Sequence, residues 1–474
     1  MRRVLVLLLV VAALGACSSD QPPEDEPDGP RVRTLSGGDG PFLAQAAGVE
    51  LPEGWVEEEL SVAGLATTYT SEGDLATDGR WALGTAFEEP YETRVVVRRP
   101  PAGDFNGTVL VEWLNVSGGF DASPDYTYLA DEILRGGYAW VGVSAQYVGI
   151  EGGPVAVSTP AAEAAGAGKG LRALDPERYG DLDHPGDAFA YDIYTQAAEA
   201  ARSGLLLGDL EPERMLAVGE SQSGFMLTTY ANGVQPLTGT FDGFLVHSRG
   251  GAAAPLGVFD SGIDIAGTLS GPPTTIRADL DVPVLTLESE SDVVGVLGYL
   301  PARQPDSGVF RLWEVAGAAH ADRFLLGPLA DGLGCPAPVN DGPQHLVAKA
   351  ALRSLDRWVR DGVAPPTADR LAVAGTAYER DRDGIVRGGI RTPLVDAPVD
   401  VLSGDPAPDG PLHCLLFGST RPLPEARVAE RYANRAAYQA AYDEAADAAV
   451  DAGFVLPEDR AALMAYAQPD RVSP

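Results

Sequence analysis

The chain has 474 residues, and its 34 Lys and Arg against 68 Asp and Glu give a formal net charge of −34. Such acidity excludes nucleic acid as a partner, because binding a phosphate backbone depends on basic side chains that release counterions. Apolar residues make up 45% and charged residues 22% of the chain, which excludes an intrinsically disordered protein and indicates a globular one with a sizeable core.

The first residues indicate an exported protein. Arg2 and Arg3 precede an apolar run over residues 4–14, which is too short to cross a bilayer and is typical of a signal peptide. The quartet LGAC, which ends at Cys17, resembles the lipobox of bacterial lipoprotein signals, in which the cysteine is diacylated and becomes the mature N-terminus. We therefore expect a signal peptide over residues 1–16, a lipid anchor on Cys17 and an extracytoplasmic location on the bacterial membrane. An ordinary secretory signal with a chance cysteine is the alternative.

The expected location also bears on the next segment and on the two remaining cysteines. Residues 17–40 carry Pro, Gly, Ser and acidic residues without apolar periodicity, so we expect a disordered tether. With Cys17 used as the anchor, Cys335 and Cys414 remain as an even pair. Because disulfides form outside the cytoplasm, we expect these two to be bonded; two buried free thiols are the alternative.

From about residue 41, strand-like segments alternate with helical patterns, which predicts an α/β protein. We expect one integrated domain over 41–474, with insertions at about 149–187 and 248–280 and a C-terminal extension at about 367–474. The predicted strands are 94–98, 108–114, 138–144, the MLAV segment within 211–219, 243–247, 282–287 and 310–315, with an extended segment at 393–402. The predicted helices are 126–135, 191–207, 225–231, 347–361, 432–452 and 457–466. The sequence has no metal-ligand spacing such as His-Glu-x-x-His.

A candidate nucleophile lies in the segment GESQSG, residues 219–224, between a predicted strand and a predicted helix. A serine with small residues two positions before and after it is typical of the nucleophile elbow, a sharp turn that exposes the hydroxyl. Ser223 takes the place of the second glycine of this motif, and it is the poorer candidate because the bulky Phe225 follows it. We therefore expect Ser221 to be the nucleophile; a flexible surface loop is the alternative.

An elbow serine needs an acid and then a histidine further along the chain, each after a strand. Asp292 follows the predicted strand 282–287 in the segment ESESD, with Glu290 as the alternative acid. His320 follows the next strand in the segment AGAAH. The remaining histidines have the wrong order or context, and we expect structural or cleft-lining roles for them: His184, His247, His345 and His413.

The tetrahedral intermediate of acyl transfer also needs two backbone N–H donors. Gln222, the residue after the nucleophile, provides one of them. We expect the other from the loop over residues 114–119, with Asn115 as the best single donor, because its glycines allow the backbone to approach a substrate closely. A simple tight connection after a strand is the alternative.

Together these motifs resemble the family of secreted bacterial α/β-hydrolase domain-containing proteins over nearly all of the mature chain. The matching segments are NGTVLVEWLNVSGG, HPGDAFAYDIYTQA, GESQSG, LESESD, AGAAHAD, GGIRTP, CLLFGST and VDAGFVLPEDRAAL. The resemblance implies the α/β-hydrolase fold, which is a mostly parallel central sheet with helices on both faces. It also implies a triad of Ser221, Asp292 and His320, and it implies no particular substrate.

We therefore expect a serine hydrolase that cleaves carboxylic esters through an acyl-enzyme, without a metal or an organic cofactor. The acidity of the chain favours a neutral or cationic small-molecule ester and leaves the lipid on Cys17 as the only membrane contact. An acyltransferase with the same triad is one alternative. A non-catalytic ligand-binding lipoprotein is another, although it would have no use for the ordered Ser, Asp and His.

Overall fold

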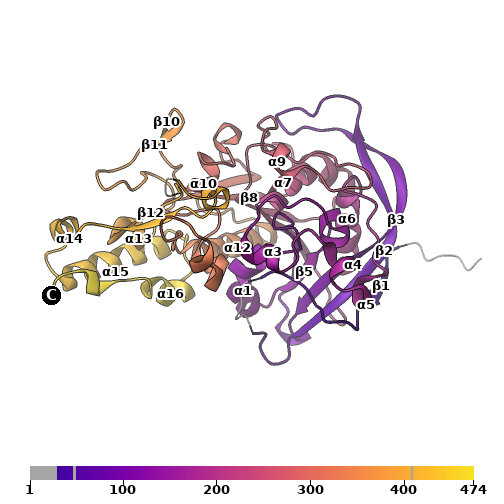
Figure 1. The fold of residues 1–474 in the computed structure, drawn as a ribbon, viewed down its shortest axis with the longest axis horizontal. Helices are drawn as coiled ribbons and strands as arrows, with labels where there is room; N and C mark the ends of the chain where they lie inside the picture. Colours follow the sequence, from indigo (N-terminus) through magenta and orange to yellow (C-terminus); the bar gives the residue numbers. More distant parts are fainter. Residues whose placement is uncertain (1–28, 46–49, 407–408) are drawn as a thin grey trace, which may run out of the picture.

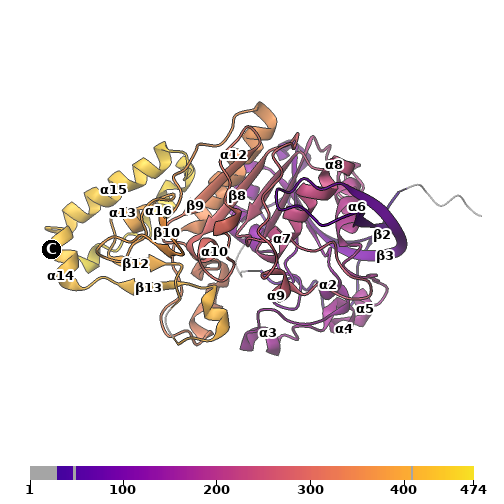
Figure 2. The same cartoon turned by 90° about the horizontal axis from the view of Figure 1, so that it is seen from above.

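A large β-sheet forms the centre of the protein in the computed structural model, which describes residues 29–45, 50–406 and 409–474. In these residues the sheet has nine strands (Figure 1, Figure 2): β1 (Arg31–Thr34), β2 (Val56–Ser71), β3 (Leu83–Arg99), β4 (Thr108–Trp113), β5 (Ala139–Val143), β6 (Arg214–Glu220), β7 (Gly243–His247), β8 (Val284–Ser289) and β9 (Phe310–Val315). Their order is β1-β2-β3-β5-β4-β6-β7-β8-β9. The pairs from β1 to β5 are antiparallel, and the pairs from β5 to β9 are parallel. The sheet is therefore mostly parallel, as predicted.

Helices cover both faces of the sheet because successive side chains of each central strand point to opposite sides. On β4, Val109 and Val111 pack into one core cluster, which also contains side chains of α6 (Ala190–Arg202) and α7 (Gln222–Thr229). Leu110, between them, packs into the opposite cluster with α1 (Pro124–Gly136) and α12 (Gln344–Asp361). The sheet therefore lies between two hydrophobic cores, as in the predicted fold class.

The predicted tether ends earlier than expected. Residues Arg31–Thr34 form β1, which pairs antiparallel with Leu60–Ala63 of β2, and Val32 packs against the core. The prediction of a disordered tether over 17–40 is therefore wrong from residue 31 onward, because this short segment finds a partner strand at the edge of the sheet. Residues 1–28, which include the predicted signal peptide and Cys17, lie outside the described residues.

Short helices occupy most of the connections between the strands. The stretch predicted as the first insertion contains α2 (Tyr147–Glu151), α3 (Pro160–Ala164), α4 (Gly170–Leu174) and α5 (Pro176–Tyr179), and the second contains α9 (Ile265–Thr268). The others are α8 (Gln235–Thr238), α10 (Glu290–Val293) and α11 (Arg323–Leu326). Two parts of the first insertion contact each other, since the Gly153 N–H donates to Gly168 O at 2.9 Å.

The C-terminal extension lies beside the β9 edge of the sheet (Figure 1, Figure 2). It contains the strand pairs β10 (Val373–Ala374) with β11 (Ala377–Tyr378) and β12 (Asp400–Ser403) with β13 (Ser419–Pro422), and the helices α13 (Pro393–Asp396), α14 (Glu425–Arg431), α15 (Arg435–Asp451) and α16 (Arg460–Met464). An extended segment over 393–402 was expected, but its first residues form α13, because Pro393 favours the first position of a helix.

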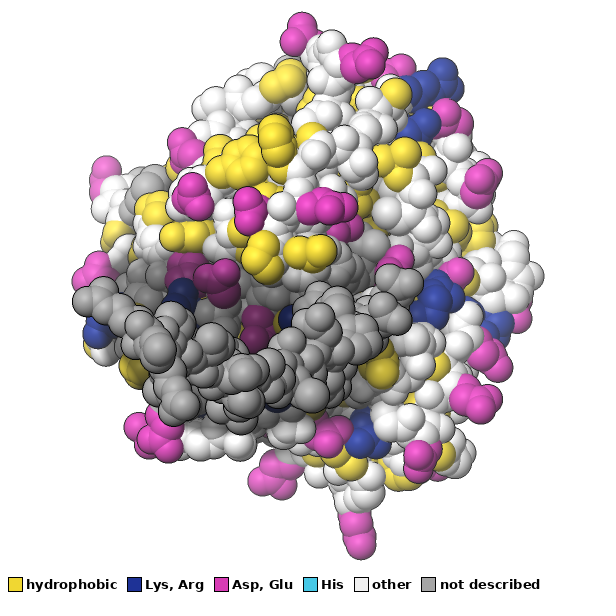
Figure 3. Space-filling view, turned by 90° about the vertical axis from the view of Figure 1, so that its right-hand side faces the viewer, with side chains coloured by type: hydrophobic (Ala, Val, Ile, Leu, Met, Phe, Trp, Pro, Cys, Tyr) yellow, Lys and Arg dark blue, Asp and Glu magenta, His cyan; other side chains and the backbone are white. Residues whose placement is uncertain are grey.

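The surface bears the acidity of the sequence. On the face of the molecule in Figure 3, acidic side chains are spread widely and basic ones lie scattered among them. Within the described residues, no helix combines the length and the apolar character that crossing a membrane requires.

Candidate active site

Ser221 lies at the turn between β6 and α7 in a backbone conformation that residues other than glycine rarely adopt, with φ 60° and ψ −121°. Its N–H donates to His247 O, at the end of β7, at 2.9 Å. A Cβ added to Gly219 would lie 3.0 Å from Ser223 Cβ, so the small residues on either side of Ser221 face each other. The turn is therefore as sharp as the nucleophile elbow requires, and it needs small residues at both places.

Three predicted residues form one hydrogen-bonded chain in the structure. His320 Nε2 lies 2.8 Å from Ser221 Oγ, and His320 Nδ1 lies 2.7 Å from Asp292 Oδ1. Asp292 follows β8 in the short helix α10, and its second oxygen accepts the Ser289 N–H at 2.6 Å. His320 comes from the loop after β9, so the carboxyl ends of three parallel strands bring the side chains together. Asp292 and His320 are both buried.

The charges around His320 favour its protonated form. Burial alone would lower its pKa, but the carboxylates of Glu220 and Asp292 raise it to about 9. Burial also tends to raise the pKa of Asp292, yet the neighbouring His320 and the Ser289 N–H bring it below its ordinary value. Asp292 therefore stays ionised beside an imidazole that readily becomes charged.

Glu220 is a member of the site that sequence reasoning missed. Its Oε1 lies 3.4 Å from His320 Nε2, the nitrogen that faces Ser221. Burial raises the pKa of Glu220 to about 7, although His320 and His247 counteract this effect. Its place in the sequence directly before the nucleophile was the available signal.

Two other carboxylates lie close to Asp292 in the sequence, namely Glu288 and the alternative acid Glu290. Glu290 accepts the Gly317 N–H at 2.6 Å through Oε1 and the Gly404 N–H at 3.0 Å through Oε2, so it joins the loop before His320 to the C-terminal extension. Both carboxylate oxygens of Glu288 are buried without a hydrogen-bond partner in the described part of the chain, and burial raises the pKa of this group well above its ordinary value. Asp292 is thus the carboxylate aligned with His320 Nδ1.

Asn115 was expected as an oxyanion donor, and its backbone does not fit that role. The Asn115 N–H donates to Ala122 O at 2.9 Å, because the two residues form an antiparallel bridge. Its side chain donates to Glu220 O at 3.1 Å and so fastens the loop to the strand that carries Ser221. The next N–H, of Val116, makes only a long bond of 3.4 Å to Gln222 Oε1 and is therefore the better candidate. Gln222 itself is the first residue of α7, where N–H groups lack partners within the helix.

A buried polar chain fixes the side chain of Gln222. Its Nε2 donates to Gln146 Oε1, which also accepts the Trp113 Nε1–H at 3.1 Å. Gln146 Nε2 in turn donates to Asp187 Oδ2 at 3.1 Å, and Asp187 Oδ1 accepts the Tyr147 N–H at 2.7 Å. The HPGD segment that contains Asp187 therefore acts on the site indirectly, by holding the residue after the nucleophile.

The other histidines lie in four different settings. His247 is buried, and its Nδ1 lies 2.8 Å from Asp125 Oδ1. His184 Nε2 lies 2.9 Å from Ala145 O, and the ring of His345 stacks on Phe324 with a centroid distance of 3.7 Å. His413 was expected to be structural; it does donate from Nε2 to Leu333 O at 2.9 Å, but it also lines the cavity at Ser221.

A cavity of about 310 Å³ opens at Ser221. Its lining comes from both predicted insertions, from the turn after Asp292 and from the C-terminal extension, and none of its lining residues is Asp, Glu, Lys or Arg. Two other cavities, of about 280 and 470 Å³, contain none of the three aligned residues. The cavity at Ser221 can therefore bring a substrate to the hydroxyl.

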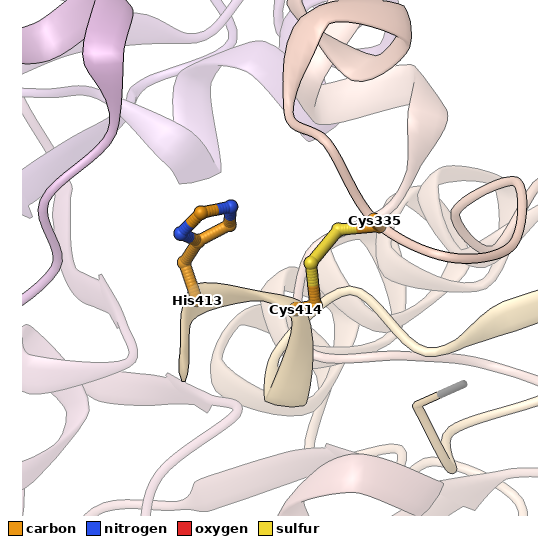
Figure 4. A group of neighbouring side chains, drawn as sticks. All are labelled: Cys335, His413 and Cys414. Carbon is orange, nitrogen blue, oxygen red and sulfur yellow. A yellow bond between two sulfur atoms is a disulfide. The ribbon is translucent and has the colours of Figure 1, made fainter. Parts of the chain in front are cut away.

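Cys335 and Cys414 are joined by a disulfide, as predicted (Figure 4). Cys414 and His413 are neighbours on one segment, while Cys335 comes from another. These three side chains are close enough to hold a metal ion, with their potential ligand atoms within 4.8 Å of one another. Metal ions bind cysteine as the thiolate, however, and the two sulfur atoms of a disulfide are not thiolates. The group therefore stabilises the fold in this oxidised state.

Comparisons with known proteins agree with this architecture. Residues 26–465 match the sequence profile of a family described as alpha/beta hydrolase domain. Among solved structures, the chain is similar to fungal esterases from Rhizomucor miehei (15% identity, 66% of this chain and 85% of that chain, TM-score 0.32) and to Est1E from Butyrivibrio proteoclasticus (10%, 57% and 96%, 0.30). It is also similar to a dienelactone hydrolase from Anabaena variabilis (15%, 50% and 85%, 0.27). No curated protein matches the sequence significantly.

Proposed function

The chain belongs to the alpha/beta hydrolase domain family, and on this premise we propose that it is an extracytoplasmic serine hydrolase that cleaves carboxylic esters. The observation that carries the proposal is the continuous chain from Ser221 Oγ through His320 to Asp292, with contacts of 2.8 and 2.7 Å. The strained turn at Ser221 and the cavity beside it support the same activity. A ligand-binding protein would have no need of this alignment.

In the proposed mechanism, His320 Nε2 accepts the proton of Ser221 as Oγ attacks the ester carbonyl carbon. The N–H groups of Gln222 and Val116 stabilise the oxyanion of the tetrahedral intermediate. Protonated His320 then gives its proton to the leaving alcohol. Water activated by His320 hydrolyses the acyl-enzyme and regenerates Ser221. Asp292 keeps the ring in the required tautomer and stabilises the imidazolium in both steps.

Labelling with a fluorophosphonate probe tests the nucleophile. We expect the wild type to be labelled and Ser221→Ala to lose both the label and about 10⁶-fold in kcat for an ester such as p-nitrophenyl acetate. Ser223→Ala is the matched control, since Ser223 lies two residues away, is buried and has no hydrogen-bond partner for its hydroxyl in the described residues. Persistent labelling of Ser221→Ala, or unlabelled but folded wild type, would contradict the proposal.

A further inference from the structure

We propose that the segment His413–Leu416 of the C-terminal extension forms a specificity wall of the active site, which selects uncharged esters with an apolar group of moderate size. This inference rests on the proposed ester hydrolysis, because it names the substrate class of that site. The wall is far from the triad in the sequence, and it reaches Ser221 only through the way the extension folds back.

The chemistry of the cavity defines the substrate. Apart from Ser221, Gln222, two other serines and His413, the side chains that line it are apolar, and none carries a permanent charge. A cationic or anionic group would lose its hydration there without a counter-charge, which is strongly unfavourable. The excess acidity of the chain therefore lies outside this cavity, and the earlier expectation of a neutral or cationic ester narrows to a neutral one.

The volume of the cavity indicates how large the apolar group of the substrate can be. At roughly 30 Å³ for each non-hydrogen atom, the share that a water molecule takes in the liquid, about 310 Å³ holds on the order of ten such atoms. This exceeds an acetyl group and suits a medium-chain or single-ring group. Val157 and Leu269 contribute to the lining from the two predicted insertions, and Leu415 and Leu416 contribute to it from the extension.

Three contacts hold the wall in place beside the catalytic histidine. Leu416 O accepts the N–H of Ala321, the residue after His320, at 3.1 Å. Cys414 is bonded to Cys335, and His413 donates to Leu333 O at 2.9 Å (Figure 4). Because these contacts lie within four consecutive residues, the side chains of the wall keep a fixed position relative to the base.

Esters with a constant small alcohol test the proposal, with acid release as the measurement. For the wild type we expect kcat/KM for ethyl hexanoate to exceed that for ethyl acetate at least tenfold. Two charged esters of similar length serve as the comparison: monoethyl adipate and ethyl 6-(trimethylammonio)hexanoate. We expect kcat/KM for each of them to be at least a hundredfold lower than for ethyl hexanoate. Equal rates for the charged and uncharged esters would overturn the proposed substrate class.

Leu415→Asp tests the wall itself. It should lower the ratio of kcat/KM for ethyl hexanoate to kcat/KM for ethyl acetate at least tenfold. Leu237→Asp is the matched control, since Leu237 is 51% exposed and does not line this cavity. Retained fluorophosphonate labelling of Ser221 reports that a variant is folded. If Leu415→Asp does not fold, the double variant Cys335→Ser with Cys414→Ser takes its place, with the same selective loss expected.

The outcomes separate the two proposals. If no ethyl ester is cleaved, the proposed ester hydrolysis fails, and the substrate class fails with it. If ethyl acetate is cleaved but neither chain length nor the wall variants change the preference, the specificity wall alone is wrong.

Discussion

Glu220 places a second carboxylate beside the catalytic histidine. Asp292 contacts Nδ1 of His320, whereas Glu220 approaches Nε2, the nitrogen that accepts the proton of Ser221. In the proposed mechanism, a negative charge at this point would stabilise the imidazolium that forms during the attack. The same charge raises the pKa of His320, so in this mechanism one side chain would both assist the reaction and restrict its pH range.

This balance predicts a measurable pH dependence. Only neutral His320 can accept the proton of Ser221, and its pKa is raised to about 9, so kcat/KM of the wild type should rise with pH up to about 9. Glu220→Gln removes a carboxylate that raises this pKa, and the acidic limb of the profile should move down by about one to three pH units. The profile is measured with ethyl acetate, with Glu89→Gln at an exposed position as the control. An unchanged limb in Glu220→Gln would contradict the role of this charge.

At the scale of the elements, the central strands could be predicted because they are buried on both faces. Strands β4 to β9 are short apolar runs, which stand out in the sequence. Strand β2 and the first half of β3 were missed, since they form a long antiparallel pair with many polar or exposed residues and depend on each other's register. Local pattern alone does not contain that pairing.

The candidate site also has parts that could be predicted from the sequence and parts that could not. The order of Ser221, Asp292 and His320 along the chain was sufficient to select them, because each follows a strand. The commitment of the Asn115 N–H to Ala122 and the approach of His413 to the cavity both depend on tertiary contacts between distant segments. Sequence reasoning therefore selected the three side chains that the structure aligns, and it missed the contacts that surround them.

The C-terminal extension packs against the turn that carries Asp292, and this contact gives a prediction at the scale of the elements. A Cβ added to Gly404 would lie 2.5 Å from Ser291 N and closer still to Glu290 Cβ, so Gly404→Ala must push the extension away from the turn that carries Asp292. We expect a loss of about 1–3 kcal/mol in the free energy of unfolding and a lower kcat. Denaturant titration measures the first, with Gly308→Ala as the control, since a Cβ there meets no atom within 4 Å. Equal stability of the two variants would argue against tight docking.

At the scale of the whole molecule, the net charge affects how the protein can interact with a membrane surface. The formal charge of −34 becomes −36 if a signal peptide with Arg2 and Arg3 is removed. Acidic side chains are spread over the face in Figure 3 rather than gathered at one place. Anionic lipid headgroups repel such a surface, so the charge disfavours electrostatic adsorption to a membrane.

We therefore predict that a lipid on Cys17 is what attaches the protein to the membrane. Two acyl chains hold a protein stably where one does not, so the wild type should stay in the membrane fraction during a wash with about 1 M NaCl, which screens charge interactions. Cys17→Ser should move to the soluble fraction and lose incorporation of an alkyne-labelled fatty acid. Its kcat/KM should not change, since the structure of the active site involves residues from 115 onward. Membrane retention of Cys17→Ser, or release of the wild type by salt, would show that another contact holds the protein.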